Sequence, residues 1–187
     1  MNLKTVISTV VLICWIAFSS IAQDNTSTHE IDVQIPEVAL LELVSETQHD
    51  IQLNATSPSE AGNAVDFSNA TTNRIWINYS SIISETTPTR QVIAMVKGTM
   101  PKGLKLIVEA SEFSGTGKGR LGKPAGEVVL SGQPTDVIVD IGSCYTGRGA
   151  NNGHCLTYKL EKNESSDSYA TLKSQHSSVS VVYTLTD

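Results

Sequence analysis

Cysteines, aromatic residues and basic residues are scarce in this sequence, and each shortage narrows the range of functions. Its 187 residues include three cysteines, and aromatic side chains make up 5% of them. Lys and Arg number 13 against 19 Asp and Glu, which gives a formal net charge of −6. Because nucleic acids and anionic membranes attract clusters of Lys and Arg, we expect neither as a partner. The charge balance instead predicts a solubilising acidic surface.

Recognisable catalytic motifs are also lacking. The sequence contains neither the HExxH motif of zinc proteases nor the GxSxG motif of serine hydrolases. Asp136 and Asp140 lie four residues apart in one alternating stretch, where they fit the polar face of a strand. The glycine-rich stretch 114–124 lies in an expected long flexible loop, residues 114–126. It and the stretch 142–153 precede β patterns, whereas a phosphate-binding loop precedes a helix. We therefore predict a protein that is not an enzyme and holds no cofactor.

A long apolar run occurs only at the N-terminus. Residues 6–18 are mostly apolar, follow a positive charge at Lys4, and are too few for a membrane span. Ser20 and Ala22 are small residues of the kind that signal peptidase requires before its cleavage site. We predict a signal peptide over residues 1–22 and export to the periplasm, the outer surface or the medium. Loss of Lys4 leaves 12 of the 13 basic residues against 19 acidic ones, a net charge of −7, and no transmembrane anchor.

The mature chain keeps two cysteines, Cys144 and Cys155, at the ends of the stretch CYTGRGANNGHC. His154 adds one more possible ligand, but a structural zinc site needs four, so we predict no metal site. Export places the two cysteines in an oxidising compartment, where an even pair close in sequence predicts a disulfide. We expect a β-hairpin whose tip is closed by a Cys144–Cys155 bond. Such a bond would restrict the unfolded chain by roughly 3 kcal/mol.

Apolar residues recur at every second position along the mature chain, between short clusters of Gly, Pro, Asn and Ser. This pattern, with no helical stripe, predicts an all-β protein. The alternating segments are 31–35, 38–44, 50–56, 74–83, 89–98, 104–111, 127–131, 135–143, 155–162 and 178–187. Their spacing favours an immunoglobulin-like antiparallel β-sandwich of about seven to nine strands, with a closed barrel as the alternative. We expect one domain over residues 31–187, after a flexible stretch at 23–30.

Trp76 is the most prominent candidate for ligand contact. If Ile75, Ile77 and Tyr79 face the core, then Trp76 and Asn78 point outward by strand parity. An outward Trp beside an amide is typical of a sugar-binding platform. Large aromatic side chains are usually mostly buried, so a covered Trp76 is the alternative. The expected hairpin tip adds further candidate contacts for a partner: Arg148, Asn151, Asn152 and His154.

Several stretches together resemble a known kind of protein. These are FSSIAQ at the end of the signal, PKGLKLIVEA, YTGRGANNGHCLTYKL and the terminal SVSVVYTLTD. They are similar to small secreted bacterial β-sandwich proteins of the pilin-like kind, such as fimbrial subunits and spore-coat-U-like proteins. The FSSIAQ ending also resembles export signals of the Bacteroidetes. The resemblance implies a surface or fimbrial structural protein whose partners are other proteins or copies of itself.

Strand exchange is the mode of assembly that the resemblance implies. In that mode an extended peptide adds a strand to an exposed sheet edge. The segment IDVQI, with Ile31, Val33 and Ile35 alternating, is the candidate donor strand, and a normal first strand of the domain is the alternative. The predicted function is a non-catalytic cell-surface or fimbria-like structural or adhesion protein. The alternative function is a carbohydrate- or ligand-binding module that uses Trp76.

Overall fold

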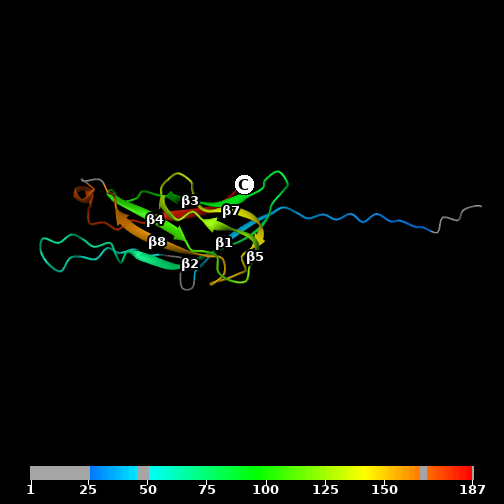
Figure 1. Cartoon of the computed structure of the whole chain (residues 1–187). Coiled ribbons are helices and arrows are strands. Elements are labelled where there is room, and N and C mark those ends of the chain that lie inside the picture. The colour runs from blue at the N-terminus through cyan, green and yellow to red at the C-terminus, as the bar shows by residue number, and fades with distance from the viewer. Residues whose placement is uncertain (1–25, 46–50, 165–167, 187) are drawn as a thin grey trace, which may run out of the picture. The chain divides into compact units, whose positions relative to one another are not determined.

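The computed structural model describes residues 26–45, 51–164 and 168–186 (Figure 1). The predicted signal peptide, residues 1–22, lies outside the described residues. The larger compact unit begins at Pro36, and the described residues before it, 26–35, contain no strand or helix. No helix of the described chain is long and apolar enough to cross a membrane.

Nine strands and one short 3₁₀ turn make up the described part of the compact unit. The strands are β1 (Val38–Ser45), β2 (Thr71–Ile82), β3 (Arg90–Lys97), β4 (Leu104–Ala110), β5 (Lys118–Pro124), β6 (Glu127–Leu130), β7 (Thr135–Tyr145), β8 (His154–Lys162) and β9 (Ser180–Thr186). The 3₁₀ turn, η1, covers Tyr169–Thr171. The prediction of an all-β protein is therefore confirmed.

The strands form two antiparallel layers joined through β2 (Figure 1). One layer has the order β1–β2–β8–β4–β6, and the other has the order β5–β7–β3–β9. The early part of β2 pairs with β8, whereas Ser80 and Ser81 pair with Tyr145 and Cys144 of β7. The strand order runs from β6 to β9 without closing into a barrel. The arrangement is the sandwich-like one that the sequence favours over a barrel.

Alternate side chains from both layers meet in one hydrophobic core. The core residues come from six strands: Ile75, Ile77, Tyr79, Val92, Ala94, Val96, Leu106, Val108, Ala110, Val128, Leu130, Val137, Ile138, Ile141, Cys144, Leu156 and Tyr158. Fully burying one large aliphatic side chain contributes about 1.5–3 kcal/mol before entropic costs. The burial of every second side chain therefore determines which face of each strand points into the core.

Three expectations about individual segments are wrong. Residues 31–35 do not form a first strand, because the first strand begins at Val38, after Pro36, whose nitrogen has no hydrogen to donate to a ladder. Residues 51–56, the described part of the expected strand 50–56, contribute one isolated bridge, between Thr56 and Asp66, instead of a strand. The expected loop 114–126 contains β5, which pairs with β7 with a register shift after Gly119.

Candidate functional site

The expected hairpin does not form, because β7 and β8 both pair with β2 and not with each other. Cys144 lies opposite Ser81, and Cys155 lies opposite Trp76. Five residues of a strand span roughly 16 Å, whereas a disulfide needs Cα atoms within about 7 Å. No disulfide joins Cys144 to Cys155, so the prediction of a stapled tip is wrong. The two residues also lie on opposite faces, Cys144 in the core and Cys155 beside Trp76.

The loop between β7 and β8, residues 146–153, crosses from one layer to the other and covers Asn78. The side chain of Asn78 accepts a hydrogen bond from Gly149 N at 2.8 Å and donates one to Asn152 O at 2.5 Å. Thr146 N in turn donates to the backbone oxygen of Tyr79 at 3.0 Å. Asn78 is therefore 5% exposed, and its prediction as a surface contact is wrong because the loop uses its amide.

Asn152 joins the two glycine-rich segments that the sequence contains. Its side-chain oxygen accepts a hydrogen bond from Thr116 N at 3.2 Å, and its amide nitrogen donates to Arg148 O at 3.0 Å. Ser114 and Gly153 exchange two backbone bonds of 2.9 and 2.8 Å. A β-carbon on Gly115 would lie 2.4 Å from the Asn152 side-chain oxygen. The glycines therefore serve close packing between the two segments, and Asn152 is a structural residue of the loop.

His154 is fully buried, so its prediction as an exposed contact is wrong. Its Nδ1 atom lies 2.8 Å from Ser111 O, and a carbonyl oxygen only accepts, so Nδ1 donates this bond. The Tyr79 hydroxyl lies between His154 Nε2, at 2.9 Å, and the backbone oxygen of Leu121. Burial, and less strongly the neighbouring Cys144, raise the pKa of Tyr79. Tyr79 and His154 together close the end of the core beneath the loop.

Trp76, Arg148 and Asn151 are the predicted contacts that still reach solvent. The parity prediction for β2 is confirmed, because Ile75 and Ile77 are buried while Trp76 is half-buried on the outer face. The neighbours of Trp76 across the sheet are Val44 of β1 and Cys155 of β8. Arg148 and Asn151 are exposed at the tip of the loop. The structure thus brings the loop residues into contact with Asn78, whereas His154 lies in the interior.

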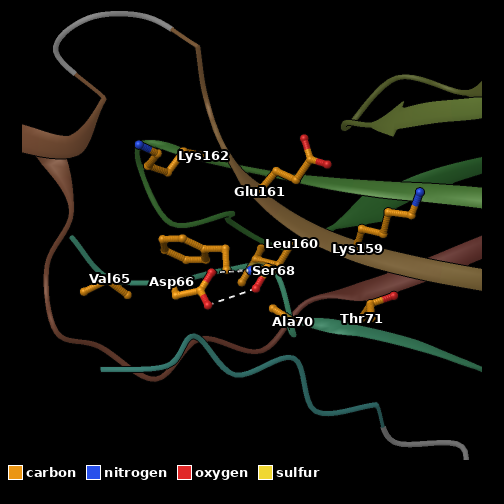
Figure 2. A pocket seen from close by; sticks show the side chains of 10 residues that line it. Val65, Asp66, Ser68, Ala70, Thr71, Lys159, Leu160, Glu161 and Lys162 are labelled. Carbon is orange, nitrogen blue, oxygen red and sulfur yellow. Dashed lines mark hydrogen bonds between the residues drawn. The ribbon is translucent and has the colours of Figure 1, made fainter. Parts of the chain in front are cut away.

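A groove that could not be expected from the sequence lies where β2 begins (Figure 2). It has a volume of about 460 Å³. Figure 2 shows Lys159, Glu161 and Lys162 of β8 along one wall and Asp66 and Ser68 on the other side. The remaining lining residues are Val65, Phe67, Ala70, Thr71 and Leu160. The only local signal in the sequence was Asp66 two residues before Ser68, a spacing typical of an Asx turn.

Charged side chains around the groove are already paired on its rim. Lys159 forms ion pairs with Glu127 and, at 3.5 Å, with Glu109. Its hydrogen bond lowers the pKa of Glu127. Hydrogen bonds from the backbone and then the side chain of Ser68 lower the pKa of Asp66. Lys162 places its ammonium 5.5 Å from the centre of the Tyr169 ring.

The described parts of the chain contain no group of three side chains that could hold a metal ion. No family model, curated protein or solved structure matches the chain.

Cys144 is expected to resist alkylation by iodoacetamide in the folded protein. Burial raises the pKa of its thiol to about 11, so roughly one molecule in a thousand carries the reactive thiolate at pH 8. Mass spectrometry of digested protein would measure labelling before and after unfolding in guanidinium. We also expect no change in Tm on adding dithiothreitol. A Tm that falls on reduction would show a disulfide and contradict the arrangement of Cys144 and Cys155.

Proposed function

We propose that the protein is a non-catalytic structural subunit of a bacterial cell surface, exported and assembled there by strand addition between copies. The observation that carries this proposal is the exposure of Ile31, Val33 and Ile35, at 73%, 77% and 76%. These side chains alternate with polar ones and belong to no strand. A row of exposed apolar side chains at a strand's spacing fits a segment that pairs with a partner sheet.

Two of the four edge strands of the sandwich carry features that oppose such pairing. β5 bears three cations, Lys118, Arg120 and Lys123, and ends in Pro124. Its Gly119 and Gly122 have φ values of +102° and +81°, which disturb the register. β6 is four residues long. Charge, proline, bulges and shortness are the usual protections of a sheet edge against added strands.

β9 carries none of these four features, and we take it as the accepting edge. It contains no charged residue, glycine or proline, and it pairs with β3 in an unbroken register of seven residues. In the described part of the chain β3 is its one ladder partner. Its inward side chains, Val181, Tyr183 and Leu185, are half-buried against the core. Residues 31–35 of a second copy would cover these side chains and complete the ladder.

Deletion of residues 23–35 is expected to abolish assembly while the fold remains intact. No strand of the described chain is lost, because the first one begins at Val38. Electron microscopy of producing cells would show surface structures with the wild-type chain and none with the deletion. The free energy of unfolding of the purified subunit should be unchanged.

A matched pair of variants tests whether assembly depends on the apolar side chains of residues 31–35 or only on the presence of this segment. Replacing Ile31, Val33 and Ile35 with serine should have the effect of the deletion. Replacing Glu30, Asp32 and Gln34 with serine should leave assembly intact, because those side chains alternate with the apolar row. Surface structures that survive the apolar replacements, or wild-type cells that never form any, would overturn the proposal.

A further inference from the structure

Hydrogen bonds on several sides hold the turn that carries Phe67. Asp66 and Thr56 exchange two backbone bonds of 2.7 and 3.0 Å, and Ala70 N donates to Phe67 O at 3.0 Å. Leu160 N donates to Ala70 O at 2.9 Å, which fastens the turn to β8. Val65 N donates to the Tyr169 hydroxyl at 3.2 Å, which links the turn to η1. The groove wall is therefore formed without a ligand, as binding sites usually are.

Phe67 has no evident role in the stability of the sandwich. Its ring is half-buried, lines the groove, and is not among the core side chains of the described chain. An aromatic ring held by an ordered turn beside a groove presents a flat apolar surface to whatever enters. The volume of about 460 Å³ lies within the range of small-molecule sites.

The charges of the lining decide which class of ligand the groove suits. The lining carries two carboxylates, Asp66 and Glu161, and two ammonium groups, Lys159 and Lys162. Lys159 also pairs with Glu109 and Glu127, and Glu161 pairs with Lys105, so charges of both signs are interspersed along the rim. An anion would meet two carboxylates and a cation would meet two ammonium groups. The rim nevertheless offers donors and acceptors together, including the hydroxyls of Ser68 and Thr71. A neutral ligand with many hydroxyls and one apolar face satisfies all of these groups.

We propose that this groove binds a neutral sugar residue of a polysaccharide, with the apolar face of the sugar ring against Phe67. The rim side chains of β8 and the turn would form hydrogen bonds to its hydroxyls. This binding function goes beyond assembly and does not depend on it, since the groove shares no residue with β9 or with residues 31–35.

Calorimetric titration of the mature chain tests the proposal. The probes are neutral oligosaccharides of glucose, galactose, mannose or xylose, four to six units long, with oligogalacturonate as the acidic comparison. We expect binding to at least one neutral probe and an affinity about tenfold lower in Phe67→Ala, through lost apolar contact. Trp76→Ala removes another solvent-reaching aromatic side chain, on the outer face of β2, and should leave the affinity unchanged.

The unfolding transition of each variant shows whether a loss of binding is local. Phe67→Ala should unfold at nearly the wild-type temperature because Phe67 lies outside the core. If it does not fold, Phe67→Leu keeps the apolar volume and removes only the aromatic face. Binding to no neutral probe, binding to oligogalacturonate alone, or neutral binding that Phe67 variants leave unchanged would overturn the proposal. So would neutral binding that Trp76→Ala abolishes.

Discussion

Replacement of Gly153 by alanine is expected to destabilise the fold by about 3–5 kcal/mol. Gly153 has a φ of +87°, in the left-handed region that penalises residues with a β-carbon. A β-carbon there would lie 2.1 Å from the carbonyl oxygen of Ile77. Because Ile77 is in β2, between β1 and β8, its backbone cannot retreat without breaking ladder bonds. The variant must therefore displace the loop that covers Asn78.

Gly149 provides the matched control in the same loop. Its φ is +90°, nearly that of Gly153, but a β-carbon there would meet nothing within 4 Å. Gly149→Ala should therefore destabilise the fold by only about 1–2 kcal/mol, the cost of a β-carbon in this backbone conformation. Guanidinium unfolding of both variants measures the difference, which isolates the contact with Ile77. Equal losses of stability in the two variants would show that the contact with Ile77 does not contribute to the effect of Gly153→Ala.

The inward face of β2 could be predicted from the sequence because burial acts locally on alternate residues. Ile75, Ile77 and Tyr79 repeat at period two, and all three lie in the core, while Trp76 faces outward. A shift of one residue would place this whole row in water, so the pattern strongly determines which side faces inward. This reasoning needs no knowledge of which strand lies beside β2.

Strand pairing could not be predicted in the same way. Consecutive strands are often neighbours, which is why β7 and β8 suggested a hairpin around CYTGRGANNGHC. Alternation is the same in a hairpin as in two strands joined by a loop that crosses between layers. Asn78 shows the consequence, because its outward parity holds while a loop 71 residues later in the chain covers it. Burial by distant segments leaves no local trace.

β5 and the groove show two other limits of the sequence. Gly119 and Gly122 suggested a flexible loop, but Gly119 permits close packing, since a β-carbon there would lie 2.3 Å from Ser143 O. The glycines thus allow β5 to lie against β7 as an irregular edge strand. The groove combines residues 65–71 with residues 159–162, and neither stretch contains a recognisable binding motif. Only the fold brings Phe67 to the end of β8.

Replacement of Arg90 by methionine is expected to destabilise the fold by about 2–4 kcal/mol, chiefly through the loss of its hydrogen bonds. The Arg90 side chain is 3% exposed and forms an ion pair with Glu37. Its guanidinium also donates to the backbone oxygens of Val38 and Ile82, the residues that pair at the start of β1. Methionine fills much of the volume but leaves these oxygens, which are only partly exposed to solvent, without their donor.

Arg120→Met serves as the control because Arg120 forms its ion pair, with Asp140, at the surface. The Arg120 side chain is 54% exposed, so its loss should cost about 1 kcal/mol or less, and less again in high salt. Urea unfolding would measure both losses, and hydrogen exchange would follow the amides of β1. We expect faster exchange at the start of β1 in Arg90→Met alone, because Arg90 fixes the point where the chain leaves Pro36 and joins the sheet. Equal destabilisation by the two variants, or unchanged exchange in β1, would show that Arg90 does not hold this junction.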